Sequence, residues 1–166
     1  TAVQADFGVC DAKDGLTRIG LQFWVPQLDG TIKYADHEWY TPNDADVAWW
    51  TDWGNTNGIE ILLTIYNNTG LWDWNLARSA FAVNRATFVS SLVSEMERLN
   101  LDGVDIDLEG IGDFESDRIA YDQFIHDLSV ELDARGKILT IDSFHYIWNA
   151  PNHNWWSDWL GEVDNI

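Results

Sequence analysis

The chain has one cysteine, three prolines and nine basic residues, and each scarcity excludes something. The single cysteine, Cys10, cannot form an internal disulfide. Because Cys10 and four scattered histidines lack metal-ligand spacing, we predict no metal site. The 28 acidic residues give a net charge of −19, and a surface this acidic repels nucleic acid and anionic membranes.

Long apolar runs are also missing. No segment reaches the roughly 18–20 apolar residues of a membrane span, and residues 1–4 lack the basic start and apolar run of a signal peptide. The 166 residues, 46% of them hydrophobic, suffice for one domain with its own core. We therefore predict a single globular domain over residues 1–166.

Tryptophan, in contrast, is abundant, with 11 residues. A core rarely needs so many, because each buried indole N–H requires a hydrogen-bond partner. Clustered tryptophans can instead form a flat apolar surface for the C–H face of a sugar ring, although a Trp-rich core would account for many of them. The candidates for sugar stacking are Trp72, Trp74, Trp148 and Trp155.

Hydrophobic periodicity predicts strands alternating with helices. One helix is expected to begin with Thr41 as N-cap and Pro42 in its first turn. A later helix is expected to turn Ile119, Phe124 and Leu128 toward the core. Strands are predicted at 18–26, 59–66, 101–110, 137–142 and, beginning, 161–166, with weaker ones at 2–10 and 31–34; helices are predicted at 41–54, 84–100 and 116–134.

This alternation with short loops indicates right-handed parallel βαβ units, either in a doubly wound sheet or in a (β/α)8 barrel. The sequence contains neither G-x-G-x-x-G nor G-x-x-x-x-G-K-S/T, so no motif supports nucleotide binding. An acidic row at the carboxyl end of a strand favours the barrel, whose active sites lie on that face.

That acidic row lies in the strand predicted over 101–110. Same-face positions are about 6.5–7 Å apart, so repulsion and desolvation should raise the pKa of at least one carboxyl, and the titration would belong to the set. A carboxylic acid so placed can stay protonated near neutral pH and act as a general acid. The acidic face carries Asp105, Asp107 and Glu109, and the apolar face Val104, Ile106 and Leu108.

Two other interpretations of the row are a solvated acidic strand edge and a calcium loop. The apolar half of the alternation argues for burial, against a solvated edge. A calcium loop starting at Asp105 requires glutamate at its twelfth position, which is Ser116 here, with Glu115 one residue short.

Residues 102–109 read D-G-V-D-I-D-L-E, and this pattern resembles the D-G-x-D-x-D-x-E signature of glycoside hydrolase family 18, the chitinases and endo-β-N-acetylglucosaminidases. The resemblance implies a (β/α)8 TIM-barrel fold with this stretch as its fourth strand. It also implies that Glu109 is the general acid, that Asp107 orients the substrate's acetamido group, and that Asp105 shares a proton with its neighbour. The implied reaction is substrate-assisted, with retention, on β-1,4-N-acetylglucosamine polymers.

The resemblance implies a secreted protein that acts on a polysaccharide or oligosaccharide and needs no cofactor. The family motif S-x-G-G at the end of the third strand stands here as T-I-Y-N at 64–67, without its glycines. A full barrel needs about 250 residues, so we expect five to six βα units, a partial catalytic domain whose carboxyl-terminal half is absent. Candidate substrate-binding residues are Tyr66, Trp72, Trp74, Asp142, His145 and Trp148.

Two further functions stay open at this point. One is a non-catalytic, lectin-like glycan-binding barrel. Such relatives typically lack the general-acid glutamate, whereas this chain has Glu109 at that position. The other is an endo-β-N-acetylglucosaminidase or a peptidoglycan hydrolase with the same motif.

Overall fold

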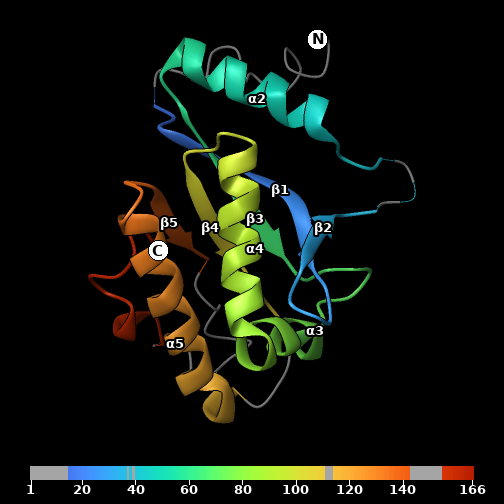
Figure 1. Cartoon of the computed structure of the whole chain (residues 1–166), viewed down its shortest axis with the longest axis vertical. Helices are drawn as coiled ribbons and strands as arrows, with labels where there is room; N and C mark the ends of the chain where they lie inside the picture. Colours follow the sequence, from blue (N-terminus) through green and yellow to red (C-terminus); the bar gives the residue numbers. More distant parts are fainter. Residues whose placement is uncertain (1–14, 37, 39, 111–113, 143–154) are drawn as a thin grey trace.

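In a computed structural model of the chain, the structure describes residues 15–36, 38, 40–110, 114–142 and 155–166, without the side chains of residues 114, 115, 155 and 156 (Figure 1). A five-stranded sheet in the order β2-β1-β3-β4-β5 forms its centre. β2 is antiparallel to β1, and the other neighbours are parallel. The strands are β1 (Arg18–Pro26), β2 (Ile32–Tyr34), β3 (Glu60–Tyr66), β4 (Gly103–Asp107) and β5 (Ile138–Ile141).

Helices connect the parallel strands, and α4 and α5 lie across one face of the sheet in Figure 1. In the described part the parallel strands follow one another in chain order, as in a (β/α)8 barrel, without the reversal of a doubly wound sheet. The helical elements are α2 (Asp44–Asn57), α3 (Trp74–Arg78), the π-helical η2 (Ser79–Val83), α4 (Arg85–Arg98), α5 (Phe114–Asp133) and the short 3-10 helix η3 (Trp155–Asp158).

The core lies between the helices and the sheet. Val104 and Ile106 of β4 are fully buried, and the rings of Phe88 on α4 and Phe124 on α5 stack with centroids 5.1 Å apart. The inward prediction for Ile119 is wrong, because this side chain is 71% exposed. The stripe of α5 that packs against the sheet contains Tyr121, Phe124, Ile125, Leu128 and Leu132 instead.

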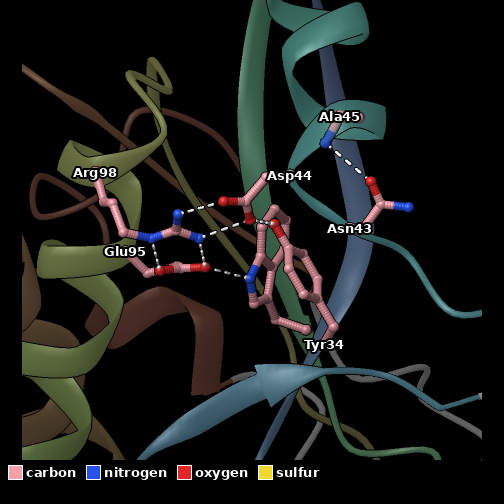
Figure 2. Close-up of polar contacts among 7 residues, drawn as sticks. Tyr34, Asn43, Asp44, Ala45, Glu95 and Arg98 are labelled. Atoms are coloured by element: carbon pink, nitrogen blue, oxygen red, sulfur yellow. Dashed lines mark hydrogen bonds and ion pairs between the residues drawn. The ribbon is translucent and has the colours of Figure 1, made fainter.

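The start of α2 lies later than predicted, because a stronger cap follows Thr41. The Asn43 side chain accepts a hydrogen bond from the Ala45 backbone N–H (2.9 Å), as Figure 2 shows, and the Asp46 carboxylate accepts one from the Asn43 N–H (3.0 Å). This reciprocal capping box satisfies two helix-end donors, so Asn43 is the N-cap.

An ion-pair network ties the start of α2 to the end of α4. The Arg98 guanidinium donates to both oxygens of Asp44 (2.6 and 2.9 Å) and both oxygens of Glu95 (2.7 and 2.9 Å), as Figure 2 shows. Glu95 also accepts from the buried indole of Trp24, and Asp44 accepts from the Tyr34 hydroxyl. Two helices and two strands are thereby joined on the side of the sheet that carries α4.

In place of the strand predicted over 161–166 the structure has isolated parallel bridges, one of which joins Asn165 to Thr140 of β5 and the other Val163 to Leu160. The Asp164 N–H donates to the Leu139 carbonyl (2.8 Å), and the Ile141 N–H donates to the Asn165 carbonyl (3.2 Å). The outer edge of β5 is therefore partly paired. The weak strand predicted at 2–10 lies outside the described residues.

Candidate active site

Asp105 lies in a row of side chains that runs across the strands on the sheet face opposite the helices. The strand register places Gln22, Thr64, Asp105 and Thr140 side by side on β1, β3, β4 and β5. The Thr64 hydroxyl donates to Asp105 Oδ2 (2.9 Å), and the Thr140 hydroxyl donates to Asp105 Oδ1. Asp105 is thus held from both neighbouring strands, which fixes the direction of its carboxylate.

A bulge in β1 turns Gln22 toward the next acidic residue along β4. The pairing of β1 with β3 moves by one position between Gln22 and Trp24, leaving Phe23 as the extra residue. Gln22 Nε2 then donates to Asp107 Oδ2 at 2.5 Å. Asp107 is 5% exposed, so this bond supplies a donor to a buried carboxylate.

The pKa values of Asp107 and Asp142 on this face are raised, and a raised pKa was predicted for at least one carboxyl of the row. Burial raises the pKa of Asp107 to about 6, and the charges of Glu109 and Asp105 add to it, while the bond from Gln22 acts in the opposite direction. Burial and the charges of Asp105 and Asp107 also raise the pKa of Asp142, at the end of β5, to about 6. The site therefore binds protons at a pH where ordinary aspartates have lost them.

Glu109 lies two residues beyond the end of β4, in the loop at its carboxyl end. The strand predicted over 101–110 is thus shorter than expected. Burial and the charge of Asp142 raise the pKa of Glu109, in the direction that keeps a general acid protonated. The fully buried Asn67 side chain binds the Glu109 main chain, accepting from its N–H (2.8 Å) and donating to its carbonyl (2.6 Å).

Tyr66 and Trp72, two of the predicted substrate-binding residues, line a pocket of about 580 Å³. Gln22, the hydrogen-bond donor to Asp107, lines the same pocket, so it adjoins the acidic row. The pKa of Tyr66 is raised by burial and by the charge of Asp107, which keeps the phenol neutral. The polar lining also includes Lys33, Asp36 and Glu38.

Trp74 is a core residue, so the prediction that it stacks on a sugar is wrong. Its side chain is 2% exposed, and its indole N–H donates to Asp117 Oδ2 (2.7 Å). Its ring packs against Phe81 and Tyr121, with centroid distances of 5.4 and 6.2 Å. The indole thus has both a partner and a full set of neighbours inside the protein.

The remaining predicted residues follow β5. Asp142 lines a second cavity of about 200 Å³ together with Asp105 and Thr140, which places it on the same side of the sheet as the row. His145 and Trp148 lie outside the described residues, as does the Trp155 side chain.

Four residues of the site were not predicted: Gln22, Thr64, Asn67 and Thr140. Gln22, Thr64 and Thr140 are polar residues within apolar strands, and that interruption is a usable signal. Asn67 gives no such signal, because an asparagine after a strand is typical of a loop. Within the described segments, no group of three or more His, Cys, Asp or Glu side chains is arranged to hold a metal ion. No helix of the described chain is long and apolar enough for a transmembrane span.

Solved structures with the same fold include several chitinases. A chitinase from Chromobacterium violaceum ATCC 12472 superposes with a TM-score of 0.72 at 18% identity, over 90% of this chain and 44% of its own. The spore cortex-lytic enzyme SleL of Bacillus cereus gives 0.65 at 18% identity, over 82% and 30%. The Ostrinia furnacalis Group IV chitinase, solved in complex with allosamidin, gives 0.62 at 20% identity, over 75% and 35%.

The chain thus spans less than half the length of these structures, and at such identities the likeness establishes the fold. None of the curated proteins matches the sequence. The sequence profile described as "Glycosyl hydrolases family 18" matches residues 8–157, which is most of the chain. The chain therefore belongs to glycosyl hydrolase family 18.

Proposed function

We propose that this chain forms part of a glycosidase that hydrolyses β-1,4 bonds between N-acetylglucosamine units, with Glu109 as the general acid. The observation that carries the proposal is the position of Glu109. It follows the carboxyl end of β4 with a raised pKa, two positions after Asp107, the last residue of that strand. Active sites of barrel enzymes lie at that end of the strands.

In the proposed reaction, protonated Glu109 transfers its proton to the glycosidic oxygen as the bond to the anomeric carbon breaks. The acetamido oxygen of the same sugar attacks that carbon, so the protein supplies no nucleophile. Asp107 accepts a hydrogen bond from the acetamido N–H and stabilises the positive charge that develops on the ring formed. Ionised Glu109 then removes a proton from the water that opens this ring, and retention results.

The pocket lined by Tyr66 and Trp72 supports a sugar substrate next to this machinery. Its volume of about 580 Å³ falls in the range of ligand sites, and aromatic walls suit the apolar face of a pyranose. We propose that sugar units on one side of the scissile bond occupy it. Such a polymer would be met outside the cell, which is the basis for proposing a secreted enzyme.

Peptidoglycan is a second candidate substrate, because Lys33 lines the pocket and an ammonium group would pair with a carboxylate of the stem peptide. Asp36 and Glu38 line the same pocket and would repel that carboxylate. With two acidic groups against one basic group, the pocket favours the uncharged N-acetylglucosamine polymer.

The test is Glu109→Gln in the full-length protein, with Glu97→Gln on the outer surface of α4 as the matched control. We expect turnover of a fluorogenic chito-oligosaccharide to fall by about 10²–10⁴-fold in Glu109→Gln. Calorimetric binding of the oligosaccharide should change little, and Glu97→Gln should match the wild type. Near-normal turnover by Glu109→Gln would contradict the assignment, and faster cleavage of peptidoglycan than of chitin by the wild type would support the second candidate.

A further inference from the structure

A single buried amide connects β3, the loop after β4 and the segment that leads into α3. Asn67 is fully buried and follows the last residue of β3. Its Oδ1 accepts from the Glu109 N–H (2.8 Å), and its Nδ2 donates both to the Glu109 carbonyl (2.6 Å) and to the Asp73 carbonyl (2.9 Å). Both the oxygen and the nitrogen of the Asn67 amide therefore make hydrogen bonds to these two segments.

The two bonds to Glu109 restrain its backbone from both sides. Its N–H and its carbonyl belong to different peptide units, so fixing both restricts the two dihedral angles that orient the Cα–Cβ bond. β3 and β4 pair up to Tyr66 and Asp107, and the Asn67 amide continues this connection beyond the ends of both strands. The Cα–Cβ bond from which the Glu109 side chain extends is thereby held by main-chain hydrogen bonds although Glu109 lies in a loop.

We propose that Asn67 is a positioning residue that holds Glu109 in the orientation required for proton transfer. This inference rests on the proposed role of Glu109. Asn67 stands where the family motif S-x-G-G has its last glycine, which has no side chain to make these bonds. The restraint therefore depends on a side chain that the motif glycine lacks.

The two hydrogen bonds from the Asn67 amide to the Glu109 main chain, called the clamp below, also affect the pKa of Glu109. The charged groups that face its carboxyl in the described part of the chain are Asp107 on β4 and Asp142 after β5. Both are acidic, and their charges and the burial of Glu109 favour its protonated form. A released loop would let the carboxyl move into water and away from Asp142, so its pKa would fall toward the ordinary value.

The first arm of the test does not depend on hydrolysis. Amide hydrogen exchange and carboxyl ¹³C titration by NMR are measured for the wild type, Asn67→Ala and Asn84→Ala. Asn84 is the matched control, because its Nδ2 also donates to two backbone carbonyls, those of Leu28 and Ser79, outside the site. We expect the Glu109 amide to exchange at least about 10-fold faster, and the Glu109 pKa to fall, in Asn67→Ala alone.

A wild-type Glu109 amide that exchanges as fast as exposed loop amides would overturn the proposal, whether or not the variants fold. So would a folded Asn67→Ala with unchanged exchange and unchanged Glu109 pKa. If Asn67→Ala does not fold, Asn67→Asp replaces it. This isosteric variant keeps the acceptor for the Glu109 N–H but places an oxygen against the two carbonyls, so faster exchange of the Glu109 amide is expected when its carboxyl is ionised. The Glu109 pKa is not a readout for this variant, because a carboxylate at position 67 would itself raise it.

The second arm measures kcat and KM of the full-length protein on a chito-oligosaccharide. We expect kcat of Asn67→Ala to fall by about 10–100-fold with little change in KM, because misplacing a reacting group by about 1 Å can cost 10² in rate. The alkaline limb of the kcat–pH profile should move to lower pH. If kcat is unchanged while the NMR changes are seen, the positioning role is overturned. If the wild type shows no hydrolysis, the proposed function is rejected, and the restraint of Glu109 by Asn67 is then tested by the NMR measurements alone.

Discussion

Gln22 Nε2 lies 2.5 Å from Asp107 Oδ2, although the two residues are 85 positions apart in the chain. The strand register alone would place Gln22 beside Thr64, in line with Asp105, and the extra residue at Phe23 directs it one step further along β4. This bond favours the ionised form of Asp107 and opposes the effect of burial on its pKa.

Replacing Gln22 with methionine should therefore raise the pKa of Asp107 above its value of about 6. Methionine keeps the length of the side chain but has no N–H donor, so the ionised carboxylate loses its hydrogen bond. Carboxyl ¹³C titration measures this pKa directly. Gln27→Met, which removes only a bond to the Pro26 carbonyl, serves as the control and should leave Asp107 unchanged. An Asp107 pKa that stays the same or falls would contradict the prediction.

The free energy of unfolding should decrease as the pH rises from about 4 to about 6. The pKa values of Asp107 and Asp142 are about 6 in the folded protein and near 3.9 in an unfolded chain, so the folded state holds more protons within this window. The lowered pKa values of Asp44 and Glu95 act in the opposite direction, at lower pH.

The difference between wild type and Asp107→Asn isolates one of these contributions. Urea unfolding at several pH values should show Asp107→Asn gaining about 1 kcal/mol relative to the wild type between pH 4 and pH 7, after allowance for solvent screening. The amide oxygen that this substitution introduces can still accept from Gln22, so the contact is kept. A pH-independent difference would show that the Asp107 pKa is not raised.

Gly103→Ala should destabilise the fold by about 1–3 kcal/mol or more. A Cβ at this position would lie 2.2 Å from the Ile138 carbonyl oxygen, which belongs to the backbone of β5 and cannot rotate away. Thermal unfolding measures the effect. Gly15→Ala is the control, because a Cβ there meets no atom within 4 Å, and it should unfold like the wild type. Equal stability of the two variants would mean that β4 and β5 are further apart than described.

Trp72 and Trp74 should respond differently to substitution although they are two positions apart. Trp72→Ala should weaken oligosaccharide binding, because Trp72 lines the pocket. Trp74→Phe should instead lower stability by about 1–3 kcal/mol, because it leaves the buried Asp117 carboxylate without the indole donor. Calorimetry and thermal unfolding of both variants separate the effects. Weaker binding by Trp74→Phe with unchanged stability would contradict the assignment of Trp74 to the core.

Much of the fold follows from local signals in the sequence. The apolar runs of β1, β3 and β5 and the alternation of β4 identify strands, and their order with the helices identifies parallel pairing. A raised pKa within the acidic row was also predictable, because the apolar alternation indicates burial, which is the largest cause for Asp107 and Glu109, and neighbouring carboxylates add to it. Hydrophobic patterning and the acidic motif were sufficient to predict the strands, their order and the acidic row, because each depends on residues close together in the chain.

Features that depend on distant residues were not predictable in this way. Ile119 satisfies the helical spacing of α5, but the helix turns a different stripe toward the sheet, and this rotation is set by packing against α4 and η2. Trp74 and Trp72 look equivalent as tryptophans in one loop, and only the partner Asp117, 43 positions away, distinguishes the core residue. The clamp of Asn67 on Glu109 spans 42 positions and leaves no local pattern.

The order of the parallel strands bears on how the site is assembled during synthesis. β3 pairs with β1, β4 with β3 and β5 with β4, so the partner of each strand has already left the ribosome when that strand emerges. Thr64 is available when β4 joins the sheet, and Thr140 arrives only with β5. The two hydroxyl donors of Asp105 therefore leave the ribosome at different times, Thr64 before the acidic strand and Thr140 after it.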